Sequence, residues 1–343
     1  MPRFSTARRA ALVLACLGLP LGACADGPAT PEDDPGTLTP PIFTASPMRL
    51  SDITEIITIG NFAPPGHTLP TEHAYFFFPK DFTPGAPLPR LPVYAPGSGT
   101  IRRFQVMGPN SYRVDVEVYS WLKYYLILLD MDTTRYRAGR KITAGEQLGV
   151  TMGHANSLDI GVVNQKIERK GFARPARYGP DTKHIDSPFR YFAEPLRSEI
   201  YARVNREGAD KDGSLEVDVA GTLAGVWFRD DVPLGVHGEA AWSRALVFGP
   251  DVRKPGQKRV SIGNGLSISG LYGVHAGAPE YASVTPARGA VGYRLDAMDN
   301  SKDPWRGVLM VQLPSPDTLY VEFFPGSSNL SEPFTSRRTR YVR

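Results

Sequence analysis

Short segments rich in aromatic and β-branched residues recur between residues 75 and 163, and Pro, Gly or Asn separates each segment from the next. Such segments are typical of β-strands joined by turns. The predicted strands are residues 75–78, 92–95, 99–107, 112–119, 124–130, 147–152 and 158–163. Because many of the connections are short, we expect mainly antiparallel pairing.

A second series of strand-like segments follows in residues 214–343, again separated by Gly, Pro or Asp. The predicted strands are residues 215–228, 244–248, 260–262, 270–275, 281–285, 289–295, 307–312, 319–324 and 338–343. About eight antiparallel strands close a barrel or pack as a sandwich. The pattern predicts a second antiparallel β domain and leaves both architectures open.

The region between the two series has no strand-like periodicity, and a helix is predicted near residues 195–207. Aromatic side chains in such a region either pin a long loop onto the β domain or line a carbohydrate or peptide groove. The residues concerned are Phe172, Tyr178, Phe189, Tyr191 and Phe192. The first alternative is the commoner one for a loop of this kind.

Residues 1–23 have the pattern of a bacterial lipoprotein signal peptide. Three arginines precede the apolar segment 10–19, which is too short for a stable membrane span, and Leu-Gly-Ala-Cys at 21–24 matches a lipobox. We expect Cys24 to become the first mature residue and to carry lipid chains that anchor it in a membrane. The alternative is ordinary cleavage after Ala23 or Ala25, which leaves Cys24 an unmodified thiol.

Residues 24–47 are rich in Pro, Thr, Asp and Gly and have no apolar periodicity, which predicts a flexible tether. No later apolar run is long enough to cross a membrane as a helix. The prediction is therefore a lipid-anchored protein of the bacterial cell envelope. In a Gram-negative cell, Ala25 in place of Asp after the lipidated Cys24 favours the outer membrane, facing the periplasm.

Charge and cysteine content exclude several kinds of site. The formal charge is +4, and residues 1–23 contribute three arginines and no acid, so their removal leaves +4 − 3 = +1. A nearly neutral chain gives no reason to expect nucleic-acid binding. Loss of Cys16 with the signal peptide and lipidation of Cys24 leave no thiol for a disulfide, a cysteine nucleophile or a thiolate metal site.

Four phrases between residues 66 and 164 resemble one known family. They are a first segment with His73, the run 91–96 followed by Gly99, the glycine-bounded return 139–149, and Ser-Leu-Asp-Ile-Gly-Val at 157–162. Together they resemble the duplicated hybrid motif domain of the lysostaphin-type (LytM-like) zinc endopeptidases, which is a barrel-sandwich fold. This resemblance implies a barrel-sandwich hybrid-like domain in the first half. With the barrel or sandwich that the strand pattern predicts for the second half, the expected fold class is all-β and mainly antiparallel.

The positions that hold zinc in that family are largely replaced here. The family places an Asp four residues after the first His, where this chain has Phe77. Its closing His-x-His pair aligns with Ser157 and Asp159, and its middle-strand His aligns with Ile127. Because catalytic zinc usually needs three protein ligands, the resemblance carries over only His73 and Asp159 as metal ligands.

Two other histidines are candidates for the missing ligand or for a general base. His67 precedes His73 by six residues, a spacing that puts both on one strand face if the strand is unbroken. His154 lies three residues before Ser157 and is able to fold back toward the site. The alternative is that His73 and Asp159 form a hydrogen bond in a groove that kept its shape and binds no metal.

Two features near the C-terminus concern the second domain. Gly225-Val226-Trp227 resembles the opening phrase of lipocalin-like barrels, in which a terminal arginine packs on the tryptophan. Four arginines alternate with other residues as in an exposed final strand, so we expect a solvated edge, with a polyanion site as the alternative. They are Arg337, Arg338, Arg340 and Arg343.

These features predict a signal peptide at 1–23, a tether at 24–47, a lysostaphin-like domain with an aromatic extension at 48–200 and a β domain at 214–343. The preferred function is non-catalytic binding or regulation of a cell-wall peptide, glycan or envelope protein, without a cofactor. One alternative is a divergent zinc metallopeptidase that cleaves peptidoglycan cross-links. Another is a small-ligand carrier around Trp227, which requires an apolar cavity in a barrel.

Overall fold

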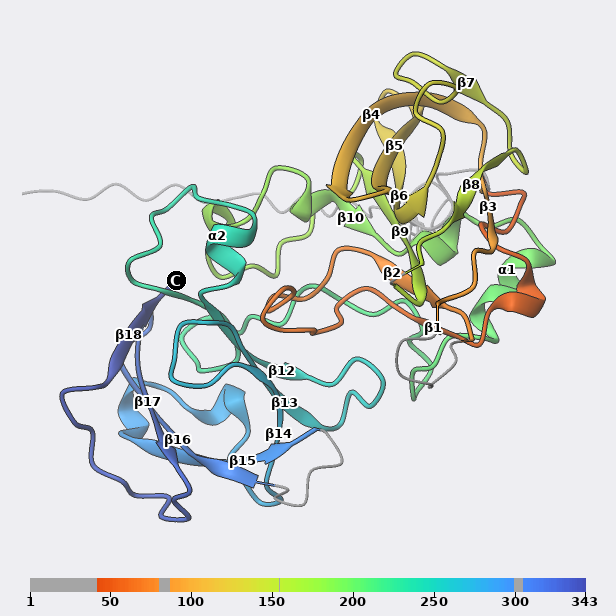
Figure 1. Ribbon diagram of the computed structural model, residues 1–343. Coiled ribbons are helices and arrows are strands. Elements are labelled where there is room, and N and C mark those ends of the chain that lie inside the picture. The colour runs from red at the N-terminus through yellow and green to blue at the C-terminus, as the bar shows by residue number, and fades with distance from the viewer. Residues whose placement is uncertain (1–41, 80–86, 154, 299–304) are drawn as a thin grey trace, which may run out of the picture. The chain divides into compact units, whose positions relative to one another are not determined.

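The first half of the chain forms a ten-stranded antiparallel sheet in the computed structural model, which describes residues 42–79, 87–153, 155–298 and 305–343 (Figure 1). The main order is β1-β2-β9-β6-β5-β4-β7, with β10 on β9 and β3 on β8. The strands are β1 Glu55–Ile57, β2 Ala74–Phe77, β3 Pro92–Tyr94, β4 Gly99–Gly108, β5 Ser111–Tyr119, β6 Leu122–Asp130, β7 Lys141–Ile142, β8 Gln147–Thr151, β9 Ser157–Asn164 and β10 Ile185–Asp186. All seven strands predicted for this half are present, within a few residues of the expected bounds.

The second half contains a closed antiparallel barrel of eight strands, so the alternative of a sandwich is wrong (Figure 1). Its strands are β11 Gly225–Arg229, β12 Ala245–Pro250, β13 Lys258–Ile262, β14 Gly270–Val274, β15 Val291–Ala297, β16 Trp305–Ser315, β17 Thr318–Pro325 and β18 Thr339–Val342. The short helices are α1 Leu196–Tyr201 and α2 Glu239–Trp242. The 3₁₀ helices are Leu50–Asp52, Pro175–Arg177, Thr182–His184, Pro188–Tyr191, Tyr281–Ser283 and Pro286–Arg288.

The last strand is not the exposed edge that its arginines predicted. β18 pairs with β17 and also with β11, so it closes the barrel. Arg343 is 7% exposed, and its guanidinium carbon lies 4.0 Å from the ring centroid of Trp227. Arg340 keeps half of its side chain exposed. The terminal arginine therefore packs on the tryptophan as the Gly-Val-Trp phrase indicated, and only part of the cluster is solvated.

The barrel interior is filled by its own side chains. Alternate residues of β11 and β12 point inward, among them Trp227, Leu246 and Phe248, all fully buried. The predicted strand 281–285 is instead the 3₁₀ helix Tyr281–Ser283, because Tyr281 and Val284 pack into the same core rather than extending the sheet. The apolar cavity that a carrier function requires is thus occupied by core residues.

The start of the described chain belongs to the first core. Residues 42–47 were expected to be tether, yet Phe43 is fully buried and its ring meets Tyr124 at 5.3 Å and Phe192 at 5.0 Å between centroids. The Phe43 amide donates a hydrogen bond to the carbonyl of Tyr191 at 2.9 Å. The rest of the predicted tether, the signal peptide and Cys24 lie outside the described residues. The tether prediction is therefore wrong for residues 42–47, where Phe43 packs into the first core.

The predicted helix 195–207 is shorter in the structure. α1 ends at Tyr201, after which the chain turns and Asn205 donates its amide proton to the carbonyl of Ile56 at 2.9 Å. Val204 forms a parallel bridge with Ile56. Pairing with this distant segment competes with continuation of the helix, and a local sequence pattern does not contain that information.

The described residues belong to one compact unit, Thr39–Arg343. Each half has its own core, and a smaller hydrophobic cluster joins the two halves. The outer face of the barrel buries Val226, Phe228 and Val247 against Phe62 of the first half. The hydroxyl of Ser261 donates a buried hydrogen bond of 2.8 Å to the carbonyl of Thr68. The loop 60–71 is thereby fixed against the barrel, and this loop leads directly into the candidate site.

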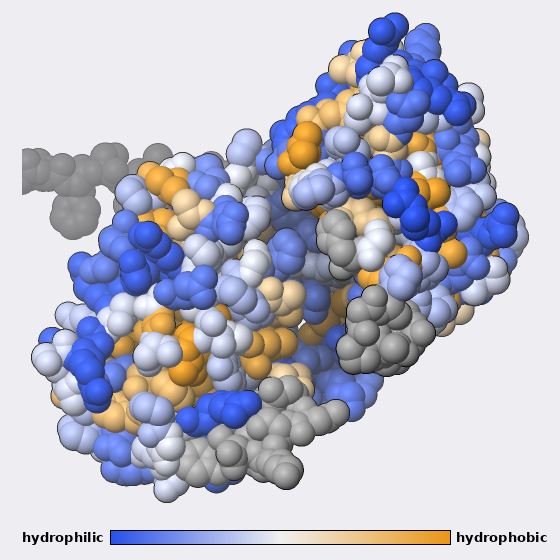
Figure 2. All heavy atoms as spheres, in the orientation of Figure 1, coloured by the Kyte–Doolittle hydropathy of each residue, from blue (hydrophilic) through white to orange (hydrophobic). Residues whose placement is uncertain are grey.

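The surface visible in Figure 2 mixes hydrophilic and hydrophobic residues. Val106 and Met107, at the end of β4, are 71% and 47% exposed. Within the described residues, no helix combines the length and the apolar character needed to cross a membrane.

Candidate functional site

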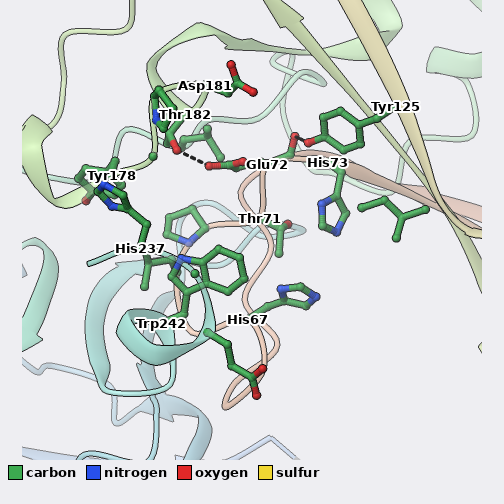
Figure 3. A pocket seen from close by; sticks show the side chains of 18 of the residues that line it. His67, Thr71, Glu72, His73, Tyr125, Tyr178, Asp181, Thr182, His237 and Trp242 are labelled. Carbon is green, nitrogen blue, oxygen red and sulfur yellow. Dashed lines mark hydrogen bonds between the residues drawn. The ribbon is translucent and has the colours of Figure 1, made fainter. Parts of the chain in front are cut away.

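A cleft of about 470 Å³ lies between the loop 67–73, one end of the first sheet and the α2 region of the barrel half. In Figure 3, His67, Thr71 and His73 lie near one another, with Trp242 and His237 beside them. The cleft is lined by residues 67, 69–73, 103, 105, 107, 113, 125, 127, 172, 177–182, 215, 237–239 and 242. Both halves of the chain therefore contribute to it.

The structure brings His73 and Asp159 together. His73 immediately precedes β2, and Asp159 of β9 is paired across the strands with Tyr75. Nε2 of His73 lies 3.5 Å from Oδ2 of Asp159, while the hydroxyl of Ser157 donates a 2.9 Å hydrogen bond to Oδ1. The two residues that the family resemblance identified are thus buried and in contact with each other.

His67 also reaches this position, but by a different route from the one predicted. Its backbone exchanges hydrogen bonds with Ala63 at 2.8 and 2.9 Å, so the chain reverses there and does not continue as one strand to His73. The imidazole rings of His67 and His73 nevertheless meet with centroids 5.5 Å apart. The prediction that His67 and His73 share one strand face is therefore wrong, although their imidazole rings do lie close together.

Burial makes both groups of the central pair uncharged near neutral pH. Desolvation lowers the pKa of His73 to about 3, and the charges of His67 and Arg113 act in the same direction. Desolvation raises the pKa of Asp159 to about 8, against the hydrogen bond from Ser157. The contact between His73 and Asp159 is therefore one between neutral groups rather than an ion pair.

The described residues do not fit a catalytic zinc ion. Phe77 and Ser157 face each other across β2 and β9, and Ile127 is paired with Asp159, so apolar and hydroxyl groups stand where ligands are needed. Nowhere in the described part of the chain do three His, Cys, Asp or Glu side chains come close enough to hold a metal. His154 lies outside the described residues, and its role as a third ligand stays a prediction.

Charged groups line another part of the cleft. The hydroxyl of Thr182 donates a hydrogen bond to Glu72, whose pKa burial raises. Lys123 pairs with Asp181 at 2.6 Å. The hydroxyl of Tyr125 donates to the backbone carbonyl of Glu72 at 2.9 Å. Sequence reasoning missed these residues, because they belong to no motif and only the fold brings them together.

The barrel half adds an aromatic and polar wall. Trp242, the last residue of α2, is 36% exposed, and Nδ1 of His237 lies 3.3 Å from the carbonyl oxygen of Arg177. The rings of Phe172 and Tyr178 lie at a tilted angle with their centroids 4.5 Å apart, and both residues line the cleft. These two loop aromatics form part of a groove.

The other three loop aromatics belong to the interior. Phe189, Tyr191 and Phe192 are buried in the core of the first half. These three residues therefore pin the loop onto the domain as predicted, whereas a carbohydrate or peptide ligand for the cleft beside Phe172 and Tyr178 stays a prediction.

No family model and no curated protein matches the sequence. Among solved structures, a zinc-containing peptidase from Vibrio cholerae is similar over 36% of this chain and 37% of its own, with 16% identity and a TM-score of 0.26. The match therefore spans little more than a third of that peptidase. Lysostaphin from Staphylococcus simulans is similar over 89% of this chain and 92% of its own, with 11% identity and a TM-score of 0.28. The SpoIIQ-SpoIIIAH pore-forming complex is similar over 46% of this chain and 96% of that one, with 13% identity and a TM-score of 0.32.

Proposed function

We propose that this chain is a cell-envelope lipoprotein that binds a cell-wall peptide in the cleft and does not cleave it. One observation carries the proposal: His73 and Asp159 stand in contact in the cleft region, buried and uncharged, with no third ligand among the described residues. Zinc activates water for peptide hydrolysis only when protein ligands hold it and one coordination position stays open. The described side chains do not provide that arrangement.

The walls of the cleft support a peptide as the ligand. Arg103, Gln105 and Met107 alternate along β4 and line the cleft. β4 pairs with β5 along its length but with β7 only at Gly99 and Thr100. An extended peptide is able to add to such a strand edge through its backbone while its side chains contact the cleft walls.

The envelope location rests on the N-terminal sequence. The lipobox at residues 21–24 supports lipid attachment at Cys24, and Ala25 supports delivery to the outer membrane of a Gram-negative cell, facing the periplasm. A protein held there faces peptidoglycan, whose stem peptides are then the nearest abundant ligands. A glycan strand or an envelope protein is the alternative partner.

Binding without cleavage is tested by two measurements on the same sample. The purified full-length chain is titrated with a soluble stem peptide while the fluorescence of Trp242 is followed, and the peptide is then analysed by chromatography after long incubation. We expect saturable binding and intact peptide, with and without a chelator. Trp242→Phe, which keeps an aromatic wall, serves as the control that assigns the signal. Chelator-sensitive cleavage would overturn the proposal in favour of a divergent metallopeptidase.

A further inference from the structure

Several polar atoms beside His73 have no hydrogen-bond partner in the protein. They are Nε2 of His73, the hydroxyl of Thr71 and the hydroxyl of Tyr75, whose residues are 7%, 4% and 7% exposed. The side chains of Thr71 and Asn61 lie beside the Tyr75 hydroxyl, but neither forms a hydrogen bond of normal geometry with it. Oδ2 of Asp159 is 3.5 Å from Nε2, too far for a strong hydrogen bond. Unpartnered buried polar groups are costly, so their concentration at one point indicates a bound group.

The chemistry of these atoms selects a donor. An ionised carboxylate only accepts hydrogen bonds, a neutral imidazole accepts at one ring nitrogen, and hydroxyls both donate and accept. A group that satisfies several acceptors at once needs several N–H donors. A primary ammonium offers three donors and no acceptor, and its positive charge suits a site that contains Asp159.

We propose that His73, Asp159, Thr71 and Tyr75 bind the ammonium group at the end of a diamino-acid side chain of the peptide in the cleft. The inference rests on the proposed function and names the part of the peptide that is recognised. Thr71 and His73 line the cleft (Figure 3), and Asp159 and Tyr75 lie against His73. Ile127 and Leu215 also line it and offer apolar surface to the methylene stem.

The charge of Arg113 disfavours a second positive charge beside His73, and the contacts of Arg113 offset part of this effect. The guanidinium carbon of Arg113 lies 3.7 Å from the ring centroid of Tyr125, and its Nε pairs with Asp115 at 2.7 Å, so a carboxylate already balances its charge. Burial lowers the pKa of His67, which keeps this ring neutral. The carboxyl of Asp159, which burial keeps neutral in the unbound chain, is the group whose ionised form a neighbouring ammonium group favours.

Three synthetic peptides test the inference with the full-length chain. The first is Ala–γ-Glu–Lys with an acetylated N-terminus and a free side-chain amine, the second carries acetyl groups on both amines, and the third has a free N-terminus and an acetylated side chain. The titrations are done at pH 8, close to the pKa that burial gives Asp159. At this pH the carboxyl group is able to ionise, and the side-chain amine of the peptide is charged. We expect the first peptide to bind about tenfold or more tightly than the other two.

Two isosteric variants locate the effect. Asp159→Asn should lower the affinity for the first peptide about tenfold and leave the second peptide unchanged. Asp296→Asn removes a carboxylate of the barrel, outside the cleft, and should change the affinity for the first peptide less than about twofold. Circular dichroism confirms that both variants are folded. Should Asp159→Asn fail to fold, the comparison of the three peptides on the unmodified chain still decides.

The outcomes separate the two proposals. Equal binding of the first and second peptides overturns the ammonium site and leaves peptide binding intact. Preference for the third peptide also overturns it, because the N-terminal amine is then the recognised group. Binding of none of the three overturns the inference and the peptide-binding function together.

Discussion

At the scale of single residues, the central feature is a histidine and a carboxyl group that burial shifts toward their neutral forms. The pKa of Asp159 is raised to about 8, so the folded chain keeps a proton that the unfolded chain releases above its ordinary pKa near 3.8. Stability is therefore lost as the pH rises from about 4 to about 8. His73, with a pKa lowered from 6.5 to about 3, acts oppositely below pH 6.5. Between pH 6.5 and 8 only the Asp159 contribution of this pair remains.

Asp159→Asn should remove that loss, because the amide has the size of the carboxyl group but does not ionise. Urea unfolding at several pH values measures it: the unmodified chain should lose stability between pH 6.5 and 8, with a slope of at most about 1.4 kcal/mol per pH unit. The variant should show a flatter profile, and Asp181→Asn should retain the original one. Parallel profiles for all three chains would contradict the assignment.

At the scale of elements, β9 and β6 are held close together because Gly161 lacks a side chain. A Cβ at Gly161 would lie 2.1 Å from the ring of Tyr125. This ring contacts the guanidinium group of Arg113 and forms part of the cleft. Tyr125 is buried at 1% exposure and is paired with Gly161 across the strands. The strand pair therefore fixes one wall of the site.

Gly161→Ala should displace Tyr125 and destabilise the fold by about 1–3 kcal/mol, as overpacking of a buried site does. Thermal unfolding gives the loss, and peptide titration should show weakened binding in the folded fraction. Gly153→Ala is the matched control, since its Cβ would have no neighbour within 4 Å. Equal stability of the two variants would show that the Gly161–Tyr125 contact does not constrain the sheet.

Local patterns predicted most of these elements, and failed where distant residues decide the conformation. β4, β5 and β6 were evident from their aromatic and β-branched residues and from the turn residues between them. The 3₁₀ helix Tyr281–Ser283 was predicted as a strand. A segment that packs into the end of a barrel has the same types of apolar residue as a strand, so the local pattern does not separate the two. At the site, motif alignment found His73 and Asp159. It gave no signal for Glu72 and its hydrogen bond to Thr182, which lies more than a hundred residues away.

At the scale of the whole molecule, a hydrophobic cluster joins the sheet half to the barrel half, and the cleft lies beside this interface. β18 closes the barrel, and Arg343 packs on Trp227 inside it. The barrel is therefore filled by its own side chains and supports α2. The sequence suggested the Trp227–Arg343 contact but not which strand completes the barrel. Strand order depends on long-range pairing, which periodicity does not encode.

The proposed anchoring belongs to this scale as well. Cys24→Ala should abolish lipid attachment and move the chain from the membrane fraction to the soluble fraction, because the lipid is the anchor we propose. Detergent phase partitioning and mass spectrometry of the mature N-terminus measure the change, and Cys16→Ala, inside the signal segment, is the control. Membrane association that persists in Cys24→Ala would refute lipid anchoring at this residue.

The central claim is that the cleft binds peptide without catalytic zinc, and metal content tests it most directly. The full-length chain is purified after expression with added zinc and compared with His73→Ala and Asp159→Ala. We expect folded unmodified protein with far less than one zinc per chain, and no difference between the three samples. About one zinc per chain in the unmodified protein, lost in both variants, would contradict the account and make the chain a divergent metallopeptidase.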